Sequence, residues 1–267
     1  MKSIKKMLVA GALGFLSLVG LTSCGNGKSD LTKVTNNKVL YVGMTFYDPM
    51  DYLAEDGETI IGFDADLSNM FAESLNAKAK FVPIAWDSKV LELDGGYIDL
   101  IWNGMTASDE LGKKIDFSLP YATNYQCVVV KNNVDSYSAT SALTGKKVAV
   151  EQGSAGDSVV TDLNTTINRV TSQLDAINEV VAGTSDCAVI DYTMAYSLVG
   201  KGNYQGLSIV DSNKISFEKE VFAVGLRKGS DLSTKLNEFL TQNYKNGKLD
   251  ELATKYGVAI NKEAFSK

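Results

Sequence analysis

The sequence predicts an α/β fold built from two similar units, and three observations support this prediction. Apolar runs of strand length alternate with stretches of helical periodicity, which is typical of α/β proteins with mostly parallel strand pairing. The chain of 267 residues is long enough for two units of ordinary domain size. A second series of strands and helices begins near Gly145, and the segmentation suggests that the C-terminal part returns to the first unit.

In the first unit, the expected strands are short apolar runs that end close to polar or aromatic residues. The helix that follows Phe63 carries its apolar residues at helical spacing. Asp87 is a good N-cap for the next helix. The expected elements are strands at residues 39–44, 79–84 and 98–102, a helix that includes Leu67, Met70, Phe71 and Leu75, and a helix from residue 87 to 93.

The second unit repeats this alternation. A Gly/Ser turn follows its first strand, and Gly183 ends its main helix. Two C-terminal helices complete the chain, and the last ends at Gly257. The expected elements are an extended run at 126–131, strands at 145–150, 187–190 and 207–210, a helix at 171–181, and a returning strand that begins near residue 220.

The stretch from Asp99 to Tyr121 carries the most specific signal in the chain: D-L-I-W-N-G-M-T-A-S-D-E-L-G-K-K-I-D-F-S-L-P-Y. The strand at its start ends in Asn103, Gly104 and Thr106, which offer amide, hydroxyl and backbone groups beyond the carboxyl edge of a sheet. Open α/β sheets place their ligands at this edge. The sequence therefore predicts a ligand site here.

This stretch resembles the first-lobe signature of the extracellular solute-binding proteins, family 3, which deliver polar amino acids to ABC importers. The C-terminal A-V-G-L-R-K-G-S and K-Y-G segments are similar to the family as well, so the resemblance covers nearly all of residues 37–258. It implies a two-lobed fold of the periplasmic-binding-protein type II, with two crossing hinge strands near residues 125–131 and 217–226. Lobe 1 is expected at 38–125 and 222–267, and lobe 2 at 126–221.

The resemblance also implies which residues hold the ligand. Two aromatic side chains would face it, one strand end would offer polar groups, and an acid would pair with its ammonium group. From the residues alone, Asp191 and Ser154 could instead be helix N-caps, Glu151 a solvated acid, and the aromatics core residues. The implied ligand-binding residues are Tyr47, Trp86, Asn103, Gly104, Thr106, Glu151, Ser154 and Asp191.

The chain departs from the family pattern at the positions that bind the ligand carboxylate. Leu111 replaces the arginine that forks this group, and Ala155 replaces a frequent Ser or Thr. Neither side chain can donate a hydrogen bond. Acids between aromatic faces suit a cation. Two hypotheses follow and both stay open: the ligand carries an amine or other cationic group and lacks the standard carboxylate, or it is a standard amino acid whose carboxylate is met by Lys113 or Lys114.

The N-terminus predicts export and a lipid anchor. Residues 1–23 combine three lysines with an apolar run that is shorter than the roughly 20 residues needed to cross a bilayer. They end in a lipobox-like L-T-S before Cys24, the expected lipid attachment site. Residues 24–37 are expected to form a flexible tether. We therefore expect an extracytoplasmic protein that is anchored to the membrane without spanning it.

Composition excludes several function classes. The net charge of −6 argues against nucleic acid as a partner. With no histidine and no clustered cysteines, neither a metal nor a cofactor is expected. Cys127 and Cys187 lie in apolar runs and are expected to be buried thiols, although a disulfide between them is the alternative.

These observations predict a binding protein and not an enzyme. Its expected partners are an amino acid or cationic amine and the permease subunits of an ABC importer, and it is expected to be a monomer. A ligand sensor that docks a receptor would have the same sequence features. The other alternative is an exported enzyme similar to cyclohexadienyl dehydratase, for which Glu151 is the candidate acid.

Overall fold

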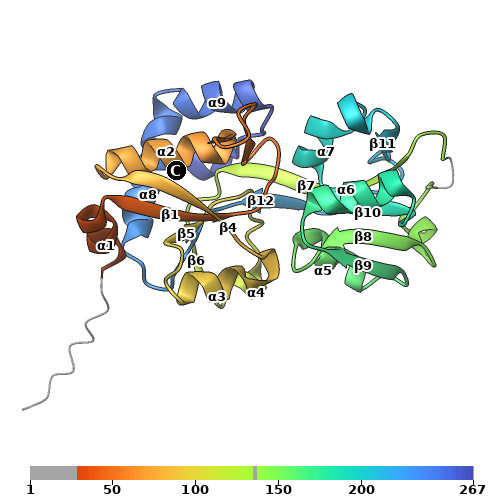
Figure 1. Cartoon of the computed structure of the whole chain (residues 1–267), viewed down its shortest axis with the longest axis horizontal. Helices are drawn as coiled ribbons and strands as arrows, with labels where there is room; N and C mark the ends of the chain where they lie inside the picture. Colours follow the sequence, from red (N-terminus) through yellow and green to blue (C-terminus); the bar gives the residue numbers. More distant parts are fainter. Residues whose placement is uncertain (1–28, 135–136, 267) are drawn as a thin grey trace, which may run out of the picture.

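The computed structural model describes residues 29–134 and 137–266, which form two α/β lobes joined by a pair of strands (Figure 1). The predicted signal segment 1–23 and the predicted lipid site Cys24 lie outside the described residues. Across the described chain, no helix combines the length and the apolar character needed to cross a membrane.

The sheet of the first lobe has the strand order β4-β1-β5-β13-β6. β1 runs parallel to β4 and β5, whereas β13 is antiparallel to β5 and β6, so the sheet is mixed. The strand predicted at 98–102 is shorter than expected. The strands of this lobe are β1 (Val39–Met44), β4 (Lys78–Pro83), β5 (Leu100–Ile101), β6 (Asp116–Phe117), β13 (Gly225–Leu226) and the separate pair β2 (Tyr52–Leu53) and β3 (Ile60–Ile61).

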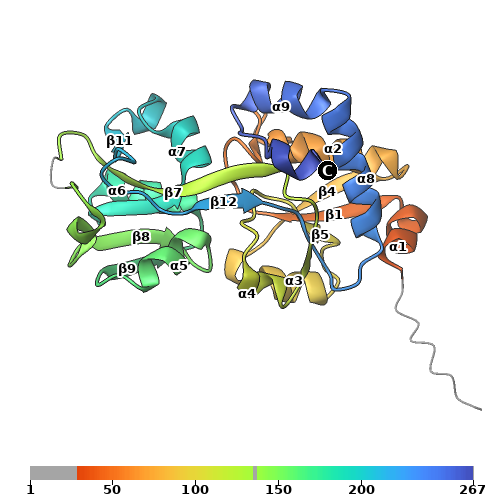
Figure 2. The ribbon, with the colours of Figure 1, turned by 180° about the vertical axis from the view of Figure 1, so that it is seen from behind.

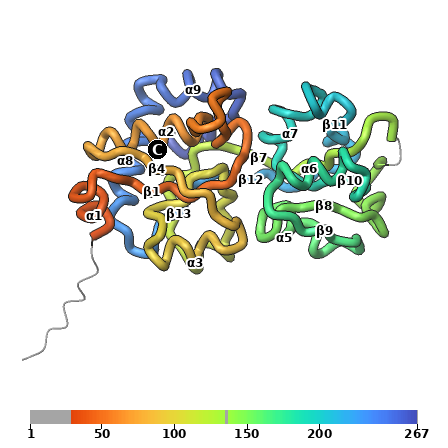
Figure 3. The backbone as a smooth tube through the Cα atoms, in the orientation of Figure 1, coloured from red at the N-terminus to blue at the C-terminus, as the bar shows by residue number. Residues whose placement is uncertain are grey.

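Helices from both ends of the chain cover this sheet. In Figure 3, α2 near the N-terminus lies beside the C-terminal helices α8 and α9, which confirms that the C-terminal part returns to the first lobe. The rings of Phe71 and Phe239 lie 5.4 Å apart between α2 and α8, and Phe71 also contacts Trp102, which is fully buried. The helices are α2 (Phe63–Ser74), α3 (Lys89–Asp94), α4 (Asp109–Gly112), α8 (Leu232–Lys245), α9 (Lys248–Tyr256) and the 3-10 turns η1 (Trp86–Ser88) and η4 (Lys262–Phe265).

The second lobe has a mixed sheet of order β11-β7-β10-β8-β9. β8 is parallel to β9 and β10, and β7 (Ala122–Lys131) is antiparallel to β10 and β11. Cys127 and Cys187 are buried, free thiols, as predicted. The elements are β8 (Lys147–Glu151), β9 (Thr166–Val170), β10 (Cys187–Asp191), β11 (Leu207–Ile209), α5 (Ala155–Thr161), α6 (Gln173–Ala182), α7 (Tyr192–Leu198) and the 3-10 turns η2 (Thr140–Leu143) and η3 (Gly202–Tyr204).

Two antiparallel strands connect the lobes, as predicted. β7 (Ala122–Lys131) starts in the first lobe and continues into the second, and β12 (Lys219–Phe222) runs back beside it (Figure 2). The pairing register places Lys219 opposite Tyr125 and Phe222 opposite Ala122. Polar side chains on these two strands therefore lie at the junction of the lobes.

The prediction of a flexible tether is wrong for residues 30–37. They form the helix α1 (Asp30–Asn37), and residues 24–28 lie outside the described chain. The Ser29 side chain caps the helix by accepting a hydrogen bond from the backbone N–H of Thr32 at 2.9 Å. Val34 is completely buried, which gives the helix an apolar contact with the first lobe. A short polar sequence thus becomes a docked helix because it is capped and anchored.

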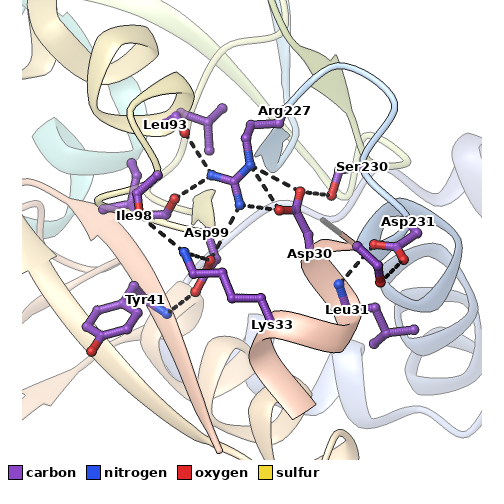
Figure 4. Close-up of polar contacts among 12 residues, drawn as sticks. Asp30, Leu31, Lys33, Tyr41, Leu93, Ile98, Asp99, Arg227, Ser230 and Asp231 are labelled. Carbon is purple, nitrogen blue, oxygen red and sulfur yellow. Dashed lines mark hydrogen bonds and ion pairs between the residues drawn. The ribbon is translucent and has the colours of Figure 1, made fainter. Parts of the chain in front are cut away.

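Arg227 is one of the polar anchors of α1, together with Ser230 and Asp231 (Figure 4). Its guanidinium group donates to the Asp30 carboxylate at 2.7 Å and to the carbonyls of Leu93 and Ile98, also at 2.7 Å. Fully buried Asp99 accepts from Arg227 at 3.4 Å and forms an ion pair with Lys33 at 2.9 Å. The cluster joins α1 to three other segments of the first lobe.

We predict that Arg227→Met lowers the free energy of unfolding by about 3 kcal/mol, because it leaves buried carboxylate and carbonyl groups without their donor. Urea unfolding measures this change. The control is Lys235→Met, which removes an exposed ion pair to Glu238 and should change stability by less than about 0.5 kcal/mol. Equal effects of the two substitutions would contradict the role assigned to Arg227.

Candidate functional site

A single cavity between the lobes is lined by all eight residues that the sequence implied. The first lobe contributes five of them from the ends of β1 and β5 and from η1, and the second lobe contributes three from the ends of β8 and β10 and from the turn before α5. Ala155 and Gln173 complete the lining. The cavity is small, about 20 Å³, which is room for about one water molecule. Any larger ligand therefore requires the lobes to part.

Asn103 is a structural link and uses its whole side chain within the first lobe. Its amide nitrogen donates to the Thr45 carbonyl at 2.9 Å and to buried Asp51 at 2.7 Å. Its amide oxygen accepts from the backbone N–H and the hydroxyl of Thr45, each at 2.9 Å. Asn103 thus fixes the ends of β1 and β5 against one another and shapes the cavity wall.

Gly104 allows the backbone to approach the cavity wall closely. Its φ angle is +55°, and an added Cβ would lie 2.7 Å from the ring of Tyr47. Its backbone N–H donates to Asp64 at 2.6 Å, and Asp64 also accepts from the hydroxyl of Tyr121 at 2.8 Å. The backbone donor of Gly104 is therefore engaged inside the lobe.

Tyr47 and Trp86 supply the two aromatic surfaces. Tyr47 is 2% exposed, and its hydroxyl has no hydrogen-bond partner among the described residues. Burial, followed by the nearby charge of Asp191, raises the pKa of Tyr47. The ammonium group of Lys89 lies 4.7 Å from the centre of the Trp86 ring. These aromatic surfaces therefore lie next to charged groups of both signs.

Asp191 is held by three side-chain amides. Its carboxylate accepts from Asn124 and Gln126 on β7, each at 2.6 Å, and from Gln173 at the start of α6 at 2.5 Å. Within the described chain its side chain makes no capping bond to α7, so the N-cap alternative does not account for this carboxylate. Burial, and then the charge of Glu220, raises its pKa to about 6.

Glu220, on the connecting strand β12, belongs to the same network and was missed from the sequence. Its carboxylate accepts from Thr106 at 2.9 Å, from Gln126 at 3.0 Å and from Asn124 at 3.2 Å. Asn124 and Gln126 could have been identified from the sequence, since they are polar residues two apart in a strand and therefore point to one face. No local feature of the sequence distinguishes Glu220 as a residue of the site.

Glu151 lies at the end of β8 and is 2% exposed. Its Oε1 atom is buried and has no hydrogen-bond partner in the described part of the molecule. Burial, followed by the charge of Asp191, raises the pKa of Glu151 to about 8, against the opposing effect of Lys89. An orphaned, buried carboxyl oxygen in a cavity wall is a candidate partner for a ligand donor.

Lys89 is the buried cation nearest to these acids, and it spans the two lobes. Its ammonium group donates to the carbonyl of Trp86 in the first lobe and of Gly153 in the second, each at 3.0 Å. Burial lowers the pKa of Lys89 to about 8. Because two carbonyls already hold this cation, it compensates only part of the negative charge of Asp191, Glu151 and Glu220.

The structure also places the residues that depart from the family pattern. Ser154 caps α5 by accepting from the backbone N–H of Asp157 at 3.1 Å, so its N-cap alternative is correct even though it lines the cavity. Lys113 is mostly exposed and forms an ion pair with Glu110 on the surface. Leu111 and Lys114 line a neighbouring cleft instead of the cavity.

In the described chain, no group of three His, Cys, Asp or Glu side chains is arranged to hold a metal ion.

We predict that Glu151→Gln stabilises the ligand-free protein at high pH. Because its pKa is about 8 when folded and near 4.5 when unfolded, wild-type Glu151 contributes stability that is fully present below about pH 4.5 and is lost as the pH rises through 8. Glutamine has no such dependence. The variant should therefore melt roughly 2–5 °C above wild type at pH 9 and within about 1 °C of it at pH 5.

The matched control for this comparison is Glu238→Gln, which changes an exposed acid on α8. It should follow the wild-type pH profile of melting temperature throughout. If Glu151→Gln follows that profile as well, Glu151 is not a buried acid with a raised pKa.

Known proteins are similar to this chain in sequence and in three-dimensional structure. Residues 40–259 match the family of bacterial extracellular solute-binding proteins, family 3. The L-cystine-binding protein TcyJ of Escherichia coli strain K12 is 31% identical over 87% of this chain and 88% of its own. The arginine-binding extracellular protein ArtP of Bacillus subtilis strain 168 is 28% identical over 96% of this chain and 98% of its own.

A solved structure extends the likeness to three dimensions. The crystal structure of an ancestral amino acid-binding protein, AncCDT-1, a precursor of cyclohexadienyl dehydratase, superimposes with a TM-score of 0.78 at 31% identity. The match covers 85% of this chain and 99% of that one. With the family match spanning both lobes and the cavity between them, this chain belongs to the bacterial extracellular solute-binding proteins, family 3.

Proposed function

We propose that the protein captures a small cationic amino acid or related amine between its lobes and delivers it to an ABC importer. The observation that carries this proposal is the excess of carboxylate at the cavity. Asp191 and Glu151 are buried in its wall, the half-buried Glu220 lies next to Asp191, and the charge of Lys89 is already shared by two carbonyls. A cation that enters between Tyr47 and Trp86 relieves the repulsion among these acids.

The names of the relatives support an amino acid or related amine as the ligand. TcyJ is an L-cystine-binding protein and ArtP is an arginine-binding protein; both ligands carry α-ammonium and α-carboxylate groups, and arginine also carries a net positive charge. The eight lining residues implied by the family are proposed as ligand contacts, with two refinements. Asn103 acts by shaping the wall, because its amide is fully used within the lobe, and Gly104 acts by its small size.

Delivery to permease subunits and anchoring through a lipid on Cys24 are part of this proposal. They rest on the lipobox-like sequence and on the family, whose members named above are binding proteins. A receptor-docking sensor remains the alternative within the binding class.

An enzyme similar to cyclohexadienyl dehydratase is the second candidate, and one observation favours it. Glu151 has a pKa of about 8 and an orphaned oxygen, which suits a general acid. The cavity argues against this enzyme, because the described lining offers no free cation for a carboxylated substrate. AncCDT-1, the solved relative that is a precursor of such an enzyme, is itself an amino acid-binding protein.

Thermal shift of a form that begins at Lys28 tests the proposal with matched pairs of compounds. Each pair consists of an amino acid and the amine that lacks its carboxylate: arginine and agmatine, histidine and histamine, cystine and cystamine. A compound at about 100 times its dissociation constant adds about 2.7 kcal/mol of stability, which a melting curve detects. We expect stabilisation by at least one cation and its loss in Asp191→Asn.

The control variant for binding is Glu238→Gln, which should respond to the ligand as wild type does. Turnover of a carboxylated cyclohexadienyl substrate that is lost in Glu151→Gln would favour the enzyme instead. A protein that no cation in the panel stabilises would contradict the proposed function.

A further inference from the structure

Two carboxyl groups lie inside the first lobe, behind the wall of the solute site. Asp51 directly precedes β2, and Asp64 lies in the first turn of α2. Both side chains are completely buried, and no lysine or arginine of the described chain is paired with either of them. Two buried negative charges without a cation are too costly to coexist, so we expect that this pair does not ionise fully in the folded protein.

Each acid of the pair holds one residue of the wall. Asp51 accepts a hydrogen bond from the side-chain amide of Asn103 at 2.7 Å. Asp64 accepts from the backbone N–H of Gly104 at 2.6 Å and from the hydroxyl of Tyr121 at 2.8 Å. The second oxygen of each acid, Oδ1, has no hydrogen-bond partner among the described residues. Because Asp64 has two donors and Asp51 only one, a proton is better placed on Asp51.

The electrostatic surroundings agree with this assignment. Burial, followed by the charge of Asp64, raises the pKa of Asp51 well above its ordinary value. Burial also raises the pKa of Asp64, against the hydrogen bonds that this acid accepts. The other ionisable groups that face the pair are the hydroxyls of Tyr47 and Tyr121, and Tyr47 in turn faces Asp191 of the second lobe. None of these groups is a cation.

Tight backbone packing keeps the two acids together. The backbone N–H of Asp64 donates at 3.0 Å to the carbonyl of Met50, the residue before Asp51. Gly62, just before α2, has a φ angle of +137°, and a Cβ added there would lie only 2.1 Å from the same carbonyl oxygen. The segment that carries Asp51 is therefore fixed against the start of α2. Uptake of a proton is then the way in which the pair loses charge without losing its packing.

We propose that the first lobe takes up a proton at Asp51 when it folds, and that the neutral carboxyl group, together with Asp64, positions Asn103 and Gly104 in the wall of the solute site. The proton comes from the solvent, since an unfolded aspartate is ionised at neutral pH. Both acids are positioning residues, because they reach a solute only through the wall. Their effect on solute binding rests on the proposed function, whereas the proton uptake does not.

Asp51→Asn tests the proton, because asparagine keeps a neutral oxygen that can accept from Asn103. Between pH 5 and 7, Asp51 of the wild type binds almost no proton when unfolded and one when folded, so the wild type loses stability as the pH rises. The ratio of folding constants, variant over wild type, should therefore rise about tenfold per pH unit in urea unfolding. Asp162→Asn changes an exposed acid and is the matched control, whose ratio should stay constant.

Asp51→Ala separates the proton from the hydrogen bond to the wall. It removes both, so it should show the same dependence on pH as Asp51→Asn but a lower stability at each pH. At pH 6, Asp51→Asn should bind arginine and agmatine within about twofold of the wild type. Asp51→Ala should bind the better of these two probes about threefold to tenfold more weakly, because Asn103 loses one of its acceptors.

Each part of the inference can fail by itself. A constant ratio of folding constants for Asp51→Asn between pH 5 and 7 would show that Asp51 is ionised in the folded protein, and the proton uptake would be wrong. Wild-type affinity in Asp51→Ala would overturn the positioning role.

If no compound of the thermal-shift panel binds the wild type, the proposed function fails while the test of the proton stands. Hydrogen exchange of the Gly104 amide, followed by NMR, then decides the positioning role. Exchange that is faster in Asp51→Ala than in Asp51→Asn supports this role, and equal exchange in the two variants overturns it.

Discussion

Negative charge that is taken out of water and only partly compensated is the constraint on which the site depends. Asp191 and Glu151 are buried at the ends of two neighbouring strands, and the charge of Asp191 raises the pKa of Glu151 while that of Glu220 raises the pKa of Asp191. Hydrogen bonds from three side-chain amides stabilise the ionised carboxylate of Asp191, and the charge of Lys89 partly offsets that of Glu151. Such an arrangement stores repulsion that a bound cation can relieve.

The same network joins the site to the hinge. Asn124 and Gln126 lie on β7 and Glu220 on β12, the two strands that connect the lobes, and all three share hydrogen bonds around Asp191. Lys89 adds a direct bond from one lobe to the other through the carbonyls of Trp86 and Gly153. Under the proposed function, charge recognition and lobe connection use the same side chains, which would couple the ligand charge to closure of the lobes.

Part of this could be predicted from the sequence. The alternation of strands and helices is a local signal that indicated the α/β class, whereas the resemblance to the family, and not a local pattern, implied that Thr106, Glu151 and Asp191 lie together. The partners of Asp191 depend on contacts between residues that are 18 to 67 positions apart, which local patterns do not encode. The helix α1 was mistaken for a tether because its polar anchors Arg227, Ser230 and Asp231 lie about 200 residues away in the sequence.

Proton release on ligand binding tests the central claim most directly. If a cation binds beside Glu151, it lowers the pKa of this acid from about 8, so binding at pH 7 should release up to about one proton. Calorimetry in buffers of different ionisation enthalpy, with the tightest cation of the panel, measures this number. The account predicts release in the wild type and much less in Glu151→Gln. Proton uptake, or no exchange at all, would contradict it.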